Sequence, residues 1–430
     1  MDRIEAANLA LQYLQLVLRH VGPADDIVRD AFTFQGKGKS NRRRTPGRKK
    51  TKGESGSPAA EYGEGINSDL ADAGSLWAQA DDFWQVIGWS FNCSVLYKHR
   101  WDRWRALLDF MIELLEMDWK NRKEALENGA LEQSLIVKYI NSGGTLAGSE
   151  RKILRAVFAD GNSKAIAEFG EIWQNETKAL KKDGAVKKAE ARIDIEADNY
   201  GDYMDEENDA DLKDSGSESS SPPAESDNRF PGSTPDIAQS LGGMDSINLR
   251  VRLLSLLSKV SEALPDAFAP LNDLYHIFFE HIRPLPIPAF FAIISPSGLY
   301  HFDKTAASTL TQYILRSIVA AAAPLPPNDN LSQDILEASY LPFAANTNSM
   351  IDNTKVSLCV ETLLRLLDQY VGLEWTPELR DRAEAGIKAR TTKAKGKRTK
   401  RGSDMISSSD GKWLLASADR IRMIVELAKP

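Results

Sequence analysis

Apolar side chains recur at steps of three and four residues along most of this chain. Between positions 101 and 119 they are Trp101, Trp104, Leu108, Met111, Leu115 and Trp119. This spacing places side chains on one face of an α-helix. The alternation of apolar and polar residues that marks a half-buried β-strand persists nowhere in the sequence. The pattern predicts an all-α protein: an irregular array of HEAT-like or bundle-like helix pairs, interrupted by long disordered charged linkers.

The same periodicity predicts where the helices lie. A helix with a wide apolar face, which must dock on another surface, is expected at 4–21. Its face is formed by Ile4, Ala7, Leu11, Leu14, Leu18 and Val21, and it is widened by Leu9, Leu16 and Val17. Further helices are expected at 83–91, 101–119, 121–140, 149–159, 162–181, 249–264, 268–282, 304–322, 354–371 and 410–428, with a turn at 92–98 and a proline-rich loop at 283–303.

Three segments lack the apolar residues that a folded domain needs. Residues 35–72 and 388–408 are basic, and 184–236 is acidic, with thirteen acidic side chains and one basic side chain between Asp194 and Asp227. Such segments bury too little apolar surface to offset the entropy lost on ordering, so we expect disordered linkers. They divide the chain into an N-terminal docking helix (1–34), a Trp-rich helical domain (73–183), a C-terminal helical domain (237–387) and a terminal helix (409–430).

Cysteine and histidine are scarce. Cys93 and Cys359 are the only cysteines, and each stands among apolar residues. This argues against a disulfide framework and a cysteine-rich zinc site, and it fits a reducing compartment. The histidines are scattered, and His276 and His281 lack the spacing of three or four residues that places two metal ligands on one helix face. We therefore expect no metal and no cofactor.

The first residues, MDRIEAANLALQYL, carry mixed charges instead of the positive region and clean apolar core of a secretory leader. No uninterrupted run of about eighteen apolar residues occurs, so no membrane span is expected. These features predict a soluble protein inside the cell.

Motifs for catalysis are incomplete. The segment 143–149, GGTLAGS, comes nearest to a phosphate-binding loop, but Ser149 occupies the position of the essential lysine. No Gly-x-Ser-x-Gly elbow appears. Cys93 stands between Phe91 and Val95, where a small buried apolar role is the more common one. We expect no catalytic residue and no small-molecule substrate, so the protein is not expected to be an enzyme.

Tryptophans concentrate in one region, with five of them within residues 75–104. The candidate residues for a core or a partner groove are Trp77, Trp84, Trp89, Trp101, Trp104 and Trp119. Helical spacing favours packing in a core, and the alternatives are a groove for a partner or a stacking platform for single-stranded nucleic acid. A platform needs interleaved Lys and Arg, whereas the first tryptophans are interleaved with Asp81 and Asp82.

Two basic tracts stand out from a chain whose net charge is −7. Residues 37–52 hold nine basic side chains and 388–401 hold eight, with no acid in either tract. Clusters of this kind are typical of nuclear import signals or of non-specific contacts with nucleic acid, and a plain solvated linker is the alternative. The candidate residues are Arg42, Arg43, Arg44, Arg48, Lys49, Lys50, Lys395, Lys397, Arg398, Lys400 and Arg401.

The acidic linker supports the same compartment. Ser215 and Ser217 stand among acidic residues, as substrates of acid-directed kinases do, and they are the candidate phosphorylation sites. These features predict a nuclear, non-catalytic helical scaffold or adaptor subunit of a chromatin or genome-maintenance complex, in DNA repair or replication, that acts through protein–protein contacts. The expected partners are other subunits of that complex, with weak non-specific DNA or RNA contact through the basic tracts. The alternative function is a ribosome-biogenesis or RNA-processing factor whose basic tracts contact RNA.

Overall fold

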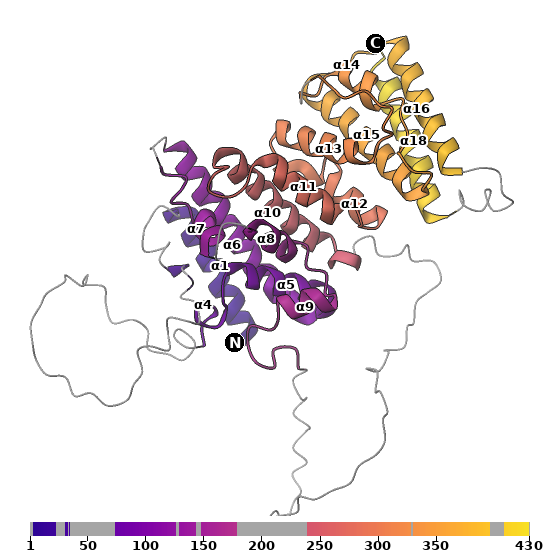
Figure 1. Cartoon of the computed structure of the whole chain (residues 1–430). Coiled ribbons are helices and arrows are strands. Elements are labelled where there is room, and N and C mark those ends of the chain that lie inside the picture. Colours follow the sequence, from indigo (N-terminus) through magenta and orange to yellow (C-terminus); the bar gives the residue numbers. More distant parts are fainter. Residues whose placement is uncertain are drawn as a thin grey trace, which may run out of the picture. The chain divides into compact units, whose positions relative to one another are not determined.

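The computed structural model describes residues 3–22, 31–32, 34, 74–125, 129–142, 148–178, 239–327, 330–395 and 408–429. Over these residues the regular elements are helices, and the only strand-like pairing is an isolated bridge between Val319 and Ala345. The protein is an all-α, irregular array of helices, as the periodicity predicts (Figure 1). The chain divides into two compact units, 1–174 with 235–430, and 175–234, and every element named below belongs to the first.

The helices of the N-terminal part gather around α5 and α6. They are α1 (Arg3–Val21), α4 (Leu76–Gln79), α5 (Phe83–Leu96), α6 (Lys98–Glu124), α7 (Leu135–Ser142), α8 (Ser149–Val157) and α9 (Ser163–Glu168). Tyr97 is the single residue between α5 and α6. Asp82 caps α5, because its carboxylate accepts a hydrogen bond from the Gln85 N–H at 2.8 Å, and it also pairs with Lys152 of α8 at 2.6 Å.

The C-terminal part is also built from helices. They are α10 (Met244–Ala263), α11 (Leu271–Ile282), α12 (Ile287–Ile294), α13 (Lys304–Ile318), α14 (Gln333–Ile335), α15 (Met350–Tyr370), α16 (Pro377–Lys395) and α18 (Ser409–Leu427). Short turns of other helix types lie at Gln239–Leu241, Gly298–His301 and Leu336–Tyr340. Helix α15 packs against α12, α13, α16 and α18, and the last two run alongside it in Figure 1.

A buried arginine joins α10 to the N-terminal helices. The Arg250 side chain is fully buried, and its guanidinium lies 4.0 Å from the centre of the Phe91 ring. It donates hydrogen bonds to the carbonyl oxygens of Val157 and Ala159, the latter at 2.8 Å. Burial lowers the pKa of Arg250 to about 9, so the group stays charged at neutral pH. One cation on α10 thus fixes the end of α8 and the face of α5.

Two expected helices are shorter than the periodicity indicates. The prediction of one helix over 121–140 is wrong, because α6 ends at Glu124 and α7 begins only at Leu135. The buried Asp118 carboxylate sets this break: it accepts a hydrogen bond from the Leu135 N–H at 2.7 Å and one from Arg122 at 2.9 Å. A carboxylate held this way satisfies the first amide of a new helix, which no apolar pattern reveals.

The prediction of a helix over 162–181 is also wrong, because α9 ends at Glu168. The Asn92 amide explains this end. It donates to the Ala165 and Phe169 carbonyl oxygens at 3.1 Å each, and its own oxygen accepts from the Gly161 N–H at 2.9 Å. Asn92 itself belongs to α5, which extends to Leu96, so the turn expected at 92–98 is reduced to Tyr97.

Three boundaries in the C-terminal part also differ from expectation. The proline-rich loop expected at 283–303 contains α12, because proline fits the first turn of a helix, where no N–H bond is lost. Helix α13 stops at Ile318, four residues before the expected 322, since Val319 turns away to bridge Ala345. The linker expected at 388–408 begins later, because α16 is helical through Lys395. The linkers expected at 35–72 and 184–236 lie outside the described residues.

Candidate functional site

The structure buries five of the six candidate tryptophans. Trp84, Trp89, Trp101, Trp104 and Trp119 are each at most 4% exposed, and Trp77 is half-buried. Inside the protein, these side chains form hydrogen bonds and ring contacts with other residues. The Trp84 indole N–H donates to the Tyr139 carbonyl oxygen at 3.0 Å, and Trp104 stacks on Trp173 with ring centres 5.7 Å apart. This arrangement fits a core and leaves none of these five rings open for a nucleic-acid base to stack on.

Most of the charged candidates lie outside the described residues. This holds for Arg42, Arg43, Arg44, Arg48, Lys49, Lys50, Lys397, Arg398, Lys400 and Arg401, and for Ser215 and Ser217. Lys395 differs, because it is the last residue of α16 and is exposed.

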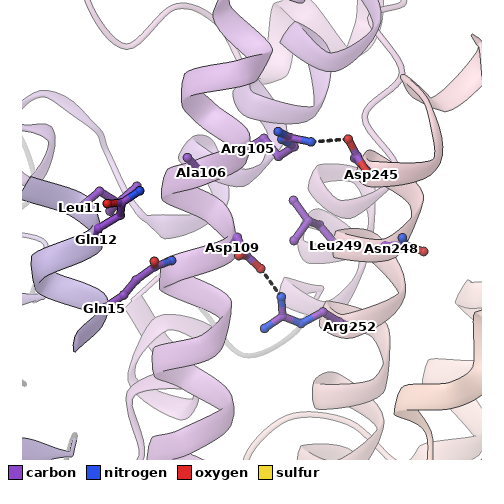
Figure 2. Close-up of a pocket in the computed structure, with 10 residues that line it drawn as sticks. All are labelled: Leu11, Gln12, Gln15, Arg105, Ala106, Asp109, Asp245, Asn248, Leu249 and Arg252. Atoms are coloured by element: carbon purple, nitrogen blue, oxygen red, sulfur yellow. Dashed lines mark hydrogen bonds and ion pairs between the residues drawn. The ribbon is translucent and has the colours of Figure 1, made fainter. Parts of the chain in front are cut away.

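A groove of about 470 Å³ lies between α1, α6 and α10. It is lined by Leu11, Gln12, Gln15, Arg105, Ala106, Asp109, Asp245, Asn248, Leu249 and Arg252, which Figure 2 shows. The sequence analysis did not identify these residues as a group, because they come from three helices that are far apart in the chain.

The charges in this groove neutralise one another. Arg105 pairs with Asp245, and Arg252 pairs with Asp109 (Figure 2). Arg252 also pairs with Glu116, at 2.6 Å. Burial by itself lowers the pKa of Arg252, but the hydrogen bonds that Arg252 donates to Glu116 and Asp109, with the attraction of those two charges, outweigh it and raise that pKa above its ordinary value. The groove therefore holds matched ion pairs that tie α10 to α6.

A second cavity, of about 360 Å³, lies beside α8, α9 and the segment that follows α11. His281 lines it and stacks on Phe158, with ring centres 5.1 Å apart and planes 3° from parallel. Burial lowers the pKa of His281, so the imidazole is neutral at neutral pH. Arg155 and Glu168, on the wall of the cavity, pair with each other at 2.8 Å. The stacked, neutral ring serves packing in this position.

Helix α1 has two apolar faces, and only one of them is partly covered. Leu18 faces α6 and is 3% exposed, whereas Leu14 and Val21 on the same face are 46% and 57% exposed. Leu9, Tyr13 and Leu16, which we call the outer strip, are 48%, 67% and 54% exposed. Steps of four and three residues place these three side chains on one face, opposite Leu18. The expectation that Leu9 and Leu16 widen the docking face is wrong. The sequence signal for a separate strip is Tyr13, a large side chain that stands four residues after Leu9 and three before Leu16, on the same face.

Other site types find no support in the described part of the chain. No group of three or more metal-ligating side chains comes together there. None of the helices in that part is both long and apolar enough to cross a membrane. Cys93 and Cys359 are buried, and burial raises the pKa of the Cys359 thiol. Comparison with models of known families, with characterised proteins and with solved structures found no match.

Proposed function

We propose that this protein is a non-catalytic helical scaffold or adaptor subunit of a nuclear complex that acts on chromatin or in genome maintenance, such as DNA repair or replication. It works through protein–protein contacts. The observation that carries the proposal is the outer strip of α1, a row of large apolar side chains that the helices in the described part of the chain leave uncovered.

The geometry of the outer strip suits a partner helix. Leu9, Tyr13 and Leu16 stand at positions i, i+4 and i+7, the spacing with which one amphipathic helix anchors in the groove of another protein. Covering such side chains stabilises a complex by roughly 1.5–3 kcal/mol for each one fully buried. The opposite face of α1 is held on α6 by Leu18 and by the pair between Arg19 and Glu113 at 2.8 Å. Helix α1 is therefore placed to present the strip outward.

The nuclear part of the proposal rests on the sequence. Residues 37–52 and 388–401 are basic tracts of the kind that import receptors read, and Ser215 and Ser217 stand in an acidic context suited to phosphorylation. Replacing the eleven import candidates by alanine or glutamine should leave a fluorescently tagged protein in the cytoplasm. Full nuclear retention of that variant would contradict import through these tracts.

The scaffold role is tested by disrupting the outer strip. Leu9→Glu with Leu16→Glu should abolish co-purification of partner subunits, because each change places a charge in the contact and leaves the folded chain soluble. The measurement is affinity purification from the source cells, with identification of the proteins retained by wild type and lost with the variant.

Leu325→Glu is the matched control, since Leu325 is 85% exposed and lies far from α1 in the sequence. The control should retain every subunit. Equal retention by the strip variant and the control would refute the proposed role of α1. Nucleolar accumulation with co-purifying ribosomal precursors would instead support the role in ribosome biogenesis or RNA processing.

A further inference from the structure

The charges on α16 are sorted along its length. Its first half carries both signs, with Glu378, Asp381 and Glu384 among its acids. From residue 385 to the end of the helix at Lys395 the sequence contains no acid. Cations placed in the last turns of a helix interact favourably with the helix dipole, so this half is both stable and strongly positive.

A buried arginine adds to the charge of this half. The Arg390 side chain is fully buried, and its Nη1 donates to the carbonyl oxygens of Leu341 and Phe343 at 3.0 Å each. Its Nε and Nη2 atoms have no hydrogen-bond partner among the described residues. Burial lowers the pKa of Arg390 to about 10, which leaves it charged at neutral pH. Carbonyl dipoles orient this cation, but they do not neutralise it.

Exposed lysines lie on the opposite face of α16 from that buried charge. Lys388, Thr392 and Lys395 follow one another at steps of four and three residues on the exposed side of α16. The two lysines are seven residues apart, which spans roughly 10 Å along a helix. Between them, Thr392 offers a hydroxyl group that can donate a hydrogen bond.

A further exposed lysine comes from α18. Ala394, Leu414 and Met350 form a small buried cluster, so the end of α16 lies against the start of α18. Lys412, in the first turn of α18, is exposed beside this cluster. The acids near this surface are Asp410, which is half-buried, Asp352, whose carboxylate accepts a hydrogen bond from Thr347 at 2.5 Å, and Glu384, one turn before Lys388, which pairs with Arg422 at 2.7 Å.

We propose that Lys388, Lys395 and Lys412, which we call the lysine surface, form a binding site for the phosphodiester backbone of nucleic acid. Lysine is a point charge that contacts phosphates without reading base edges, so the binding is independent of sequence. The site goes beyond the scaffold role and does not rest on it. An import receptor is the competing partner for these residues. We favour nucleic acid because the lysines stand on helices, which hold their charges in place, and phosphates complement that charge.

The test measures the salt dependence of binding by the full-length protein to a short DNA duplex, followed by fluorescence anisotropy. Loss of three phosphate contacts in Lys388→Ala/Lys395→Ala/Lys412→Ala should reduce the slope of log K against log salt by about 2.7, since each contact contributes about 0.9. The matched control is Lys120→Ala/Lys123→Ala/Lys138→Ala, which removes the same charge from exposed positions on α6 and α7. This control should keep the wild-type slope.

A second measurement with an RNA duplex of equal length distinguishes DNA from RNA as the ligand. The duplex that the wild-type protein binds more tightly is the preferred nucleic acid, and tighter binding of either one supports the site. Equal slopes for the lysine-surface variant and the control would overturn it. So would binding by neither duplex at low salt, or equally strong competition by polyglutamate, which would indicate an acidic protein partner. Unchanged thermal unfolding of both variants shows that the comparison reports on binding alone.

Discussion

Helices α1 and α15 are similar in length and have similar apolar spacing, but the structure uses them differently. Fifteen of the 21 residues of α15 are buried, whereas α1 keeps Leu9, Tyr13 and Leu16 about half exposed or more. The difference lies in their neighbours. Helix α15 contacts helices on several sides, and α1 rests on α6. The apolar surface that a helix offers and the apolar surface that the fold covers are therefore separate properties, and the second depends on how many helices come near.

The ion pairs of the two helices also differ in burial. In α15 the Glu361 carboxylate is 1% exposed and receives two hydrogen bonds from Arg420, at 2.6 and 2.9 Å. The ion pair that holds α1, between Arg19 and Glu113, is open to water. Buried charges in the first case must be matched by a partner, whereas water can satisfy those in the second.

The largest expected effect comes from the helix on which α1 rests. Trp104→Ala should lower the free energy of unfolding by about 3–5 kcal/mol, because it removes a buried aromatic side chain stacked on Trp173. Tyr13→Ala is the matched change on the outer strip and should change that free energy by less than about 0.5 kcal/mol. Urea unfolding of both variants checks the pair. An unaltered midpoint for Trp104→Ala would show that Trp104 is not part of the core.

A leucine pair compares α15 and α1 directly. Leu364 is fully buried, so Leu364→Ala should cost about 2–5 kcal/mol, depending on how far the cavity collapses. Leu16→Ala should leave stability nearly unchanged and weaken partner binding instead. Thermal unfolding measures the first effect and co-purification the second. Comparable losses of stability in the two variants would mean that the outer strip is covered within the chain.

The next effect concerns Glu361. Glu361→Gln replaces charged hydrogen bonds with weaker neutral ones and should cost about 1.5–3 kcal/mol, as expected for a buried acceptor of charged donors. Glu113→Gln, the equivalent change in the contact of α1, should give no measurable loss. Chemical unfolding at two salt concentrations tests this, because screening by salt reaches only the exposed pair. A strong salt dependence at Glu361 would contradict its burial.

The smallest effect is a pH dependence. The hydrogen bond from Arg422 lowers the pKa of Glu384 below its ordinary value. A carboxyl with a lowered folded-state pKa stabilises the fold at neutral pH, and this contribution is lost as pH falls through that lowered value. The pair is largely exposed, so Glu384→Gln should cost only about 0.2–1 kcal/mol at neutral pH. The difference in stability between wild type and variant should vanish in acid. A difference that grows in acid would contradict a lowered pKa for Glu384.

Much of the helical structure could be predicted from the sequence, because the apolar spacing of a helix and its first cap are local. The burial of Trp101, Trp104 and Trp119 follows from their spacing, and Asp82 and Ser408 cap helices where small polar residues precede apolar periods. The end of α6 at Glu124, the start of α7 at Leu135 and the end of α9 at Glu168 could not be predicted. They depend on Asp118 and Asn92, each of which satisfies backbone groups outside its own helix.

The sequence alone determined the fold class, the helix-forming segments and the segregation of charge into basic and acidic tracts. Only the tertiary structure decided which apolar face of α1 is covered and where the buried cations lie. Arg250 and Arg390 bind carbonyl oxygens of Val157, Ala159, Leu341 and Phe343. Every residue carries a carbonyl oxygen, so the sequence gives no sign of which ones an arginine will meet. That depends on how helices distant in the chain pack together, and the same packing leaves the outer strip and the lysine surface exposed.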